Sequence, residues 1–286
     1  MSLQLINNIN EIRKNIKSWK KDGFTIGLVP TMGALHKGHA SLIEKAKQQC
    51  DKVVVSVFVN PIQFGQNEDF DKYPRTIEAD SKICDELGVD IVFCPTSDEM
   101  YGTNKKLSND ELTFVCPSYE LVDCMCGKSR TGHFDGVATV VTKLFNIVMP
   151  DYAFFGQKDA QQLYIIKKMV LDLNMDIQIV PCPIIREDDG LALSSRNVYL
   201  SKVERENALT ISKALNKIRE LYKQNVRDIQ ILFDTAISIL HPELDLDYLE
   251  FRDFETFEKV ELVKNNTLVA IAAKSGKTRL IDNIIL

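Results

Sequence analysis

Two of the four histidines in this 286-residue chain lie three positions apart, in the segment His36-Lys-Gly-His39. The apolar run 24–29 before them predicts a buried strand, which Pro30 ends because a proline cannot donate to a central ladder. Gly33 then lets the backbone approach a ligand, and residues 38–49 predict a helix. A strand, a glycine-containing turn and a helix N-terminus form an anion site, because free N–H groups and the positive end of the helix dipole point at the turn. The two imidazoles add hydrogen-bond donors there.

The spacing of these residues narrows the kind of anion site. A lone histidine near a helix start is usually a surface or capping residue, but here two histidines and two glycines fall within seven residues. The glycines match neither the dinucleotide fingerprint nor the Walker A loop. We therefore interpret the segment as a nucleotide-phosphate site of another kind.

Polar residues also follow two later predicted strands. The run 53–59 is apolar on both faces, as in the centre of a parallel sheet, and leads to Asn60 and Gln63. Another strand ends at Gly156-Gln-Lys-Asp159, before a helix. Because ligands of open α/β sheets bind beyond the carboxyl ends of the strands, we expect these groups at the same edge as the histidines. Turn chemistry alone also explains Asn60, and most lysines are simply solvated, but the place of Lys158 before a helix favours a phosphate partner.

Two further segments carry basic and hydroxyl groups. Residues 126–136 are dense in glycine and include Arg130 and His133, which suits a solvated loop and an anion-contacting lid about equally. The run Ser194-Ser195-Arg196 can donate at least four hydrogen bonds to phosphate oxygens. Such a tripeptide is also common in surface loops, so by itself it indicates little.

Strands and helices alternate as far as residue 180. The predicted strands are 24–29, 53–59, 90–94, 151–155 and 176–180, with helices at 38–49, about 75–87, 137–149 and 159–172. This alternation predicts an α/β fold with a doubly wound (Rossmann-like) parallel sheet. The expected strand order places the loop after the first of these strands beside the loop after the fourth, at the topological switch point.

The remaining segments complete the predicted organisation. Residues 1–22 predict a helix, 95–111 an irregular stretch and 112–116 a short extra strand. After residue 185 the predicted elements are helices at 203–224 and 227–240 and strands near 247–252, 268–273 and 278–281. We predict a Rossmann-like nucleotide- and substrate-binding domain, 1–185, and a small C-terminal α+β domain, 186–286, that closes over the site.

Composition excludes some classes of function. A net charge of −5 and a pI near 5.5 argue against broad nucleic-acid binding, which needs a basic surface. No apolar run approaches the roughly 18 residues of a membrane helix. Seven scattered cysteines without a signal peptide suggest reduced thiols and a cytoplasmic location.

The histidine segment resembles the H-x-G-H signature of the adenylate-forming superfamily, and the longer string Val29–His39 is similar to the pantothenate synthetase (pantoate–β-alanine ligase) family. Further segments match that family in order: 58–64, 73–76, 130–141, 155–159 and 193–197. The resemblance spans residues 1–286 and is densest over 24–200. Two positions depart from the family pattern, with Thr131 in place of proline and Leu193 in place of methionine.

The resemblance implies a two-step ligation of pantoate and β-alanine, with ATP as substrate. Pantoate attacks the α-phosphorus to give pantoyl adenylate and pyrophosphate, and β-alanine then displaces AMP. It also implies a homodimer, and Mg²⁺ that bridges phosphate oxygens mainly through waters. Asp80 is a candidate for a water-mediated metal contact, but the metal ligands are left unassigned. The rival interpretations are a nucleotidylyltransferase that moves AMP onto a phosphorylated acceptor and a catalytically inactive nucleotide-binding module.

The resemblance assigns roles to matching residues. His36 and His39 donate to the phosphates, with His39 the better candidate for proton donor, and Lys158 shares the catalytic role. The full set implied for ATP is Pro30, Thr31, Met32, Gly33, His36, Gly38, His39, Gly156, Gln157, Lys158, Asp159, Ile185, Leu193, Ser194, Ser195 and Arg196. The set for the other substrates is Gln63, Gln162, Asn60, Arg130 and His133.

Overall fold

The computed structural model describes residues 3–65, 68–103, 107 and 111–286. Contacts divide the chain into two compact units, one of residues 1–157 and 162–183 and the other of residues 158–161 and 184–286. The boundary placed at residue 185 from the sequence stays a prediction.

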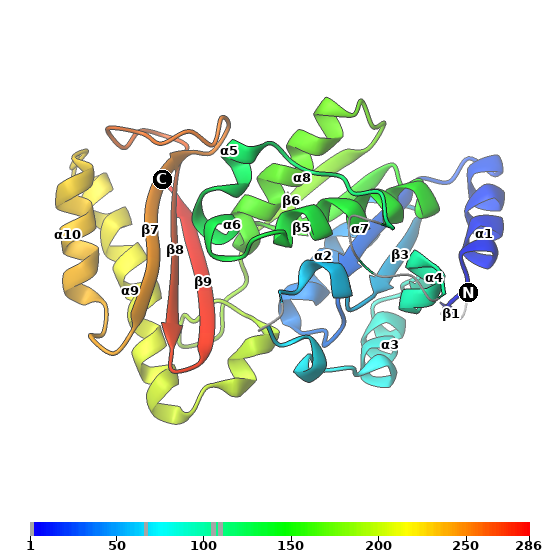
Figure 1. Cartoon of the computed structure of the whole chain (residues 1–286), viewed down its shortest axis with the longest axis horizontal. Helices are drawn as coiled ribbons and strands as arrows, with labels where there is room; N and C mark the ends of the chain where they lie inside the picture. Colours follow the sequence, from blue (N-terminus) through cyan, green and yellow to red (C-terminus); the bar gives the residue numbers. More distant parts are fainter. Residues whose placement is uncertain (1–2, 66–67, 104–106, 108–110) are drawn as a thin grey trace. The chain divides into compact units, whose positions relative to one another are not determined.

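The first unit is built on a six-stranded parallel sheet in the order β1-β4-β3-β2-β5-β6 (Figure 1). Its strands are β1 (Gln4–Ile6), β2 (Ile26–Thr31), β3 (Lys52–Val57), β4 (Ile91–Phe93), β5 (Tyr152–Gly156) and β6 (Gln178–Cys182). The α-helices between them are α1 (Ile9–Lys21), α2 (Lys37–Gln49), α3 (Ile77–Glu86), α4 (Ser97–Tyr101), α5 (Tyr119–Val122), α6 (Met125–Ser129), α7 (His133–Val148) and α8 (Ala160–Asp172). Short 3₁₀ helices are η1 (Pro61–Gln63), η2 (Phe70–Lys72) and η3 (Gln157–Asp159). The predicted doubly wound sheet is confirmed.

β3 lies inside this sheet, and its composition explains why. Val53, Val54 and Val55 are fully buried, as expected for a strand with neighbours on both edges and covered faces. On one face, Val53 and Val55 join a core cluster with Leu42 and Ile43 of α2. This packing gives the loops at the strand ends a rigid support.

The N-terminal segment differs from its predicted helix. Residues 4–6 form β1, which pairs in parallel with β4 at the edge of the sheet, and Ile6 is buried. The helix begins only after Asn8, whose side chain accepts hydrogen bonds from the backbone N–H groups of residues 10 and 11. A three-residue strand is too short to show a period in the sequence.

The prediction that Pro30 ends the first long strand was wrong. β2 continues to Thr31, and Pro30 stands level with Ser56 of β3. The carbonyl of Thr31 accepts from Phe58 N, so Thr31 faces β3 and Pro30 faces the other side. There β5 pairs with β2 only at residues 27 and 28, so the missing N–H of the proline leaves no ladder bond unmade.

The middle of the chain contains two more differences. Residues 112–116, predicted as a strand, form no regular element, and the stretch 95–111 contains α4. Residues 104–106 and 108–110 of that stretch lie outside the described residues. The loop predicted over 126–136 contains α6, and α7 begins at His133 instead of residue 137.

The second unit combines two helices with a three-stranded antiparallel sheet in the order β7-β8-β9 (Figure 1). Its elements are η4 (Ser195–Tyr199), α9 (Lys202–Lys223), α10 (Ile229–Ile239), β7 (Asp245–Asp253), β8 (Thr267–Ser275) and β9 (Thr278–Ile285). Ser201 and Glu204 form a capping box that starts α9. Ile211, Leu215 and Ile218 of α9 pack in one core with apolar residues of the three strands. The predicted small α+β unit is confirmed, with longer strands than predicted.

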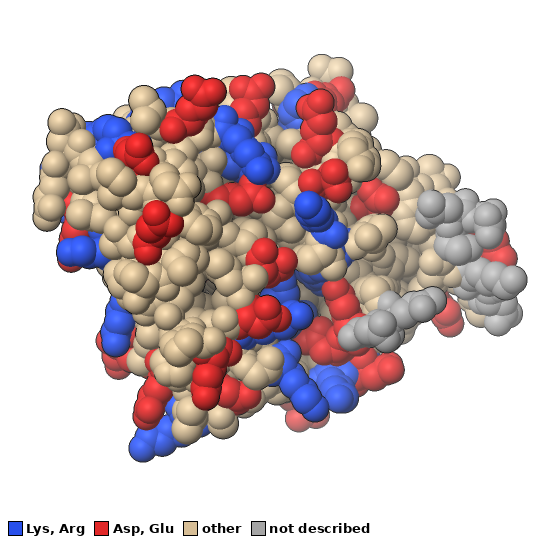
Figure 2. Space-filling view, turned by 60° about the vertical axis from the view of Figure 1, so that its left-hand side comes forward, with Lys and Arg blue, Asp and Glu red and all other residues tan. Residues whose placement is uncertain are grey.

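The surface carries both signs of charge. On the face shown in Figure 2, acidic and basic side chains alternate over short distances, and neither sign forms a continuous field. Among the described residues, none of the helices has both the length and the apolar composition needed to span a bilayer.

Candidate active site

Three strand ends meet at the carboxyl edge of the first unit's sheet. β2 lies between β3 and β5 and pairs in parallel with both. The prediction that the first and fourth predicted strands are neighbours is therefore confirmed, and the sheet reverses its order between them. The histidine turn follows β2, the turn 60–63 follows β3, and Gly156 is the last residue of β5.

The histidine turn fixes the proton position on both imidazoles. His36 is the N-cap of α2, and its Nδ1 accepts from Gly38 N at 3.1 Å. His39 Nδ1 accepts from His36 N at 3.4 Å in the reciprocal half of the capping box, and the ring centroids are 4.1 Å apart. A neutral imidazole that accepts at Nδ1 carries its proton on Nε2. Both side chains are therefore donors at Nε2, beside the positive end of the α2 dipole.

A buried carboxylate fastens the turn between β2 and α2. Asp80 of α3 accepts from Ala34 N at 3.0 Å, from Leu35 N at 2.8 Å and from Thr76 Oγ1 at 3.3 Å. Gly33 and Ala34 have φ values of 85° and 50°, so this turn is held in the left-handed region. Asp80 was a candidate for a metal contact, but in the structure its oxygens bind the backbone of the turn. The partners are 45 and 46 positions apart, which no local pattern reveals.

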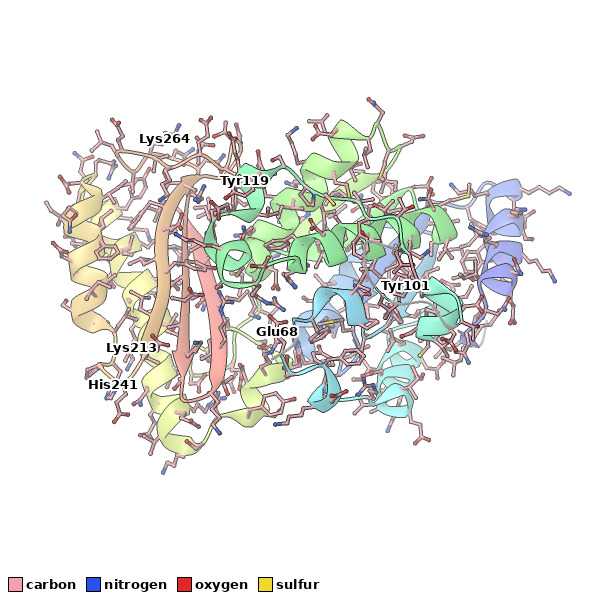
Figure 3. The ribbon with its side chains drawn as sticks, in the orientation of Figure 1. Glu68, Tyr101, Tyr119, Lys213, His241 and Lys264 are labelled. Carbon is pink, nitrogen blue, oxygen red and sulfur yellow. The ribbon has the colours of Figure 1, made fainter. Side chains whose placement is uncertain are left out.

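The turn after β3 places two carboxamides together. Asn60 Nδ2 donates to Gln63 Oε1 at 2.9 Å and to Gly136 O at 3.1 Å, and Tyr101 Oη donates to Asn60 Oδ1 at 2.6 Å. Gln63 Nε2 lies 3.2 Å from Met32 Sδ, in the segment that follows β2. Asn60, predicted as a substrate ligand, thus binds three protein groups. Sequence reasoning missed Tyr101, which comes from α4 (Figure 3).

Arg130 and His133, also predicted as substrate ligands, brace the same turn. Arg130 Nε and Nη2 donate to the two carboxylate oxygens of Glu68 at 2.7 and 2.6 Å. Arg130 Nη1 lies 2.8 Å from His133 Nε2, and His133 Nδ1 lies 2.8 Å from the carbonyl oxygen of Gln63. Since the guanidinium only donates, His133 accepts at Nε2 and donates from Nδ1 to the carbonyl. Partial burial raises the pKa of Glu68, but the hydrogen bonds and charge of Arg130 outweigh it and hold that pKa below its usual range.

In the second unit, the predicted ATP contacts at residues 185 and 193–196 belong to one hairpin and the turn after it. Leu193 N donates to Ile185 O at 3.0 Å, which sets these two residues across from each other. Ser194 is the N-cap of η4, and its Oγ accepts from Arg196 N at 3.3 Å. The predicted residues 194–196 therefore form the entry to a single turn.

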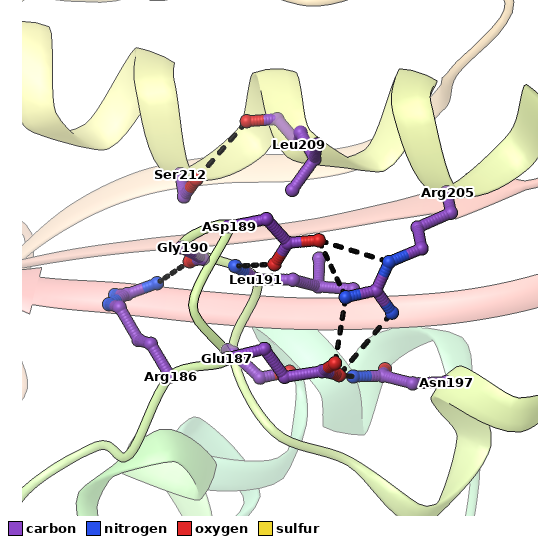
Figure 4. Close-up of polar contacts among 10 residues, drawn as sticks. Arg186, Glu187, Asp189, Gly190, Leu191, Asn197, Arg205, Leu209 and Ser212 are labelled. Atoms are coloured by element: carbon purple, nitrogen blue, oxygen red, sulfur yellow. Dashed lines mark hydrogen bonds and ion pairs between the residues drawn. The ribbon is translucent and has the colours of Figure 1, made fainter. Parts of the chain in front are cut away.

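Ion pairs hold the tip of this hairpin to α9 (Figure 4). Arg205 Nη2 donates to Glu187 Oε2 at 2.7 Å and to Asp189 Oδ2 at 2.6 Å. Glu187 Oε1 also accepts from Asn197 Nδ2 at 2.8 Å, which ties the tip to η4. The hydrogen bond from Arg205 lowers the pKa of Glu187, so this carboxylate stays ionised at neutral pH.

Lys158 follows the end of β5 and is counted with the second unit. Its backbone carbonyl accepts from Asn283 Nδ2 at 3.0 Å, and Asn283 lies buried on β9. This contact joins positions 125 apart in the sequence, so sequence reasoning did not find it. It fixes the backbone from which the lysine side chain extends.

Comparison with known proteins identifies the family. A family model described as pantoate-beta-alanine ligase matches residues 4–285, almost the whole chain. This chain belongs to the pantoate–β-alanine ligase family. The pantothenate synthetase of Clostridium novyi is 54% identical over 282 residues, which cover 98% of this chain and 97% of the relative. That of Caldicellulosiruptor saccharolyticus is 51% identical over 284 residues, 99% of each chain.

Solved structures of the pantoate–β-alanine ligase family have the same fold. The pantothenate synthetase of Thermus thermophilus matches with a TM-score of 0.91 and 38% identity over 99% of each chain. A pantoate-beta-alanine ligase from Francisella tularensis, complexed with beta-gamma ATP and beta-alanine, matches with a TM-score of 0.77 and 35% identity. That match covers 99% of this chain and 98% of the relative.

In this ligase the remaining predicted site residues lie on β2, α2, η3 and α8. Pro30 and Thr31 end β2, and Gly38 is the second residue of α2. Gln157 and Asp159 are the first and last residues of η3, and Gln162 lies on α8. Among the described residues, no group of three or more His, Cys, Asp or Glu side chains is arranged to hold a metal ion. Mg²⁺ commonly binds proteins through substrate phosphates and waters, so such a cluster is not required for its use.

Proposed function

We propose that this enzyme joins pantoate and β-alanine in an ATP-dependent ligation through pantoyl adenylate, releasing AMP and pyrophosphate. Membership of the pantoate–β-alanine ligase family supports the reaction. One structural observation supports the chemistry: two imidazoles with protons on Nε2 stand at the N-terminus of α2, at the sheet edge that also carries Gln63. That edge gathers donors for anionic groups.

The first step joins two anions. A carboxylate oxygen of pantoate forms a bond to the α-phosphorus as the bond to pyrophosphate breaks. Negative charge grows on the phosphoryl oxygens and on the leaving pyrophosphate, so fixed donors lower the barrier most. We assign His36 and His39 to these oxygens, with His39 as proton donor, and the α2 N-terminus adds its partial positive charge.

Mg²⁺ enters this proposal as part of the nucleotide substrate. It would be held by the substrate phosphates and by waters, and it would offset the negative charge of the phosphoryl oxygens. Asp80 is not assigned to the metal, because its carboxylate already accepts two backbone N–H groups and a threonine hydroxyl.

The second step forms the amide. The amine of β-alanine attacks the carbonyl carbon of the adenylate, the bond to AMP breaks, and the nitrogen loses a proton. The mixed anhydride is already activated, so the protein contributes mainly by positioning. We assign Gln63 and Gln162 to pantoate, Gln63 also to β-alanine, and give Asn60, Arg130 and His133 the role of bracing Gln63.

The residues of the second unit are assigned on family resemblance together with their local geometry. Lys158, Ser194, Ser195 and Arg196 are proposed to bind the phosphates. Leu193 and its hydrogen-bonded partner Ile185 are proposed for adenine. Asp159, together with Gly156 of the first unit, is proposed to lie near the ribose. Closure of this unit over the site, a homodimeric assembly and a cytoplasmic location stay predictions, of which light scattering tests the second.

One assay tests the reaction. Pyrophosphate release should require pantoate, and free AMP should appear only when β-alanine is added. AMP retained in a product would favour a nucleotidylyltransferase, and no turnover by folded protein would favour an inactive binding module. His39→Ala should lower turnover about a hundredfold with the fold intact, and Gln63→Glu should weaken pantoate binding by like-charge repulsion. Normal turnover in folded His39→Ala would remove the role of His39. Unchanged pantoate affinity in Gln63→Glu would remove the assignment of Gln63 to pantoate.

A further inference from the structure

The Asn60 side chain sits in a closed set of polar contacts. Asn60 is 1% exposed, and its amide nitrogen donates to Gly136 O at 3.1 Å and to Gln63 Oε1 at 2.9 Å. Its amide oxygen accepts from Tyr101 Oη at 2.6 Å. Each of the two amide hydrogens and the carbonyl oxygen thus has a partner in the first unit.

These contacts determine which way both carboxamides point. Gly136 O is a backbone carbonyl and only accepts, so Asn60 must turn its Nδ2 toward it. The second hydrogen on Nδ2 then points at Gln63, so Gln63 must accept this hydrogen bond with its Oε1. The consequence is that Gln63 presents Nε2, a pure donor, away from Asn60 toward Met32.

Tyr101 supplies the hydrogen bond that Asn60 Oδ1 accepts in this arrangement. Tyr101 is 5% exposed on α4, and burial raises the pKa of its hydroxyl, so the hydroxyl keeps its proton at neutral pH. Without that proton, Asn60 Oδ1 would be a buried acceptor with no donor, which weakens the preference for the observed orientation. In the reversed orientation Gln63 would offer an oxygen to an anionic substrate.

We propose that Tyr101 is a positioning residue for pantoate recognition, acting through Asn60 to keep the Gln63 amide donating toward the substrate. This inference rests on the proposed function, in which Gln63 binds pantoate. It explains why a tyrosine 41 positions from Asn60 has its hydroxyl directed into a polar turn instead of solvent.

Tyr101→Phe tests the inference, because it removes the hydroxyl and keeps the ring, whose centroid lies 6.2 Å from that of Phe58. We expect the KM for pantoate to rise about tenfold, the effect of losing one buried hydrogen bond. The KM for ATP, and kcat at saturating pantoate, should stay within about twofold of the unchanged enzyme. Tyr152→Phe, at the amino end of β5, is the matched control and should change none of these values.

A double-mutant cycle separates this inference from the proposed function. Gln63→Ala alone must raise the KM for pantoate, and if it does not, the assignment of Gln63 fails. If Gln63→Ala acts and Tyr101→Phe adds nothing to it in the double variant, the coupling through Asn60 is supported. Additive effects, an unchanged pantoate KM in Tyr101→Phe, or equal losses for pantoate and ATP would overturn the role of Tyr101.

Discussion

Gly136→Ala should damage pantoate recognition although the residue bears no side chain. Gly136 lies in the first turns of α7, directly against η1. A Cβ placed there would lie 2.4 Å from Ile62 O and 2.7 Å from Gln63 Cα. Both are backbone atoms, so no side chain can rotate to relieve the contact.

The size of the effect follows from these distances. Cβ atoms essentially never approach other heavy atoms within 3.0 Å, so the 2.4 Å contact must open by at least 0.6 Å. Alanine in place of glycine inside a helix gains about 1 kcal/mol of helix propensity, whereas overpacking costs about 1–3 kcal/mol. We therefore expect a loss of stability between zero and about 2 kcal/mol. The displacement matters more for the site, because a misplacement near 1 Å can lower activity about a hundredfold.

The assay is pantoate-dependent pyrophosphate release, with thermal unfolding measured alongside. We expect kcat/KM for pantoate to fall at least tenfold, and the midpoint of unfolding to fall by a few degrees at most. Gly65→Ala is the matched control, since Gly65 follows the same turn and a Cβ there meets nothing closer than 3.8 Å. Normal pantoate kinetics in a folded Gly136→Ala protein would refute the reasoning, because they would mean that Gln63 need not keep its present place.

Three more predictions concern charge, thiols and the hairpin tip. Because Arg130 holds the pKa of Glu68 below its usual 4.5, the ion pair stabilises the fold above that pH and is lost as pH falls through the lowered value. Glu68→Gln should therefore flatten the acid limb of the unfolding midpoint against pH, and an unchanged limb would contradict this. A thiol reagent should modify exposed Cys116 first, and Cys116→Ser should remove the fast phase. Burial raises the pKa to about 11 at Cys50 and Cys182 and to about 12 at Cys84, so rapid reaction of any of these three thiols would contradict their buried environment. Arg205→Ala should raise the KM for ATP a few-fold by freeing the hairpin tip, with Arg205→Lys in between, and an unaffected KM would show that the tip does not position η4.

Much of the fold was predictable because its signals are local. The apolar run of β3 and the strand–helix alternation both depend on spacing within one element, and they give the sheet class directly. That β2 and β5 are adjacent in the sheet followed from the rules for crossover connections. Pro30 shows where such a rule fails, since its effect depends on whether a partner strand extends that far.

The supporting side chains of the site were not predictable in the same way. Asp80 reaches backbone N–H groups 45 and 46 positions away, and Tyr101 reaches Asn60 over 41 positions. An aspartate in a helix and a tyrosine in a short helix look ordinary in the sequence, because their role is set entirely by the partner. The histidine turn stands out in the sequence because histidines, glycines and a strand end coincide, whereas the groups that hold this turn carry no such combination.

Main-chain groups help to determine which side chains act as hydrogen-bond donors at the carboxyl edge of the first unit's sheet. The backbone N–H of Gly38 donates to His36 Nδ1, and that of His36 donates to His39 Nδ1. Gly136 O orients Asn60, which in turn orients Gln63. In each case a main-chain group favours the side-chain orientation that presents a donor, and at Asn60 the Tyr101 hydroxyl completes that orientation. Both substrates in the proposed first step are anions. Hydrogen-bond donors that are already in place at this edge of the sheet offset the repulsion between them before the reaction begins. A chain of net charge −5 can therefore bring them together through local geometry, without a basic surface.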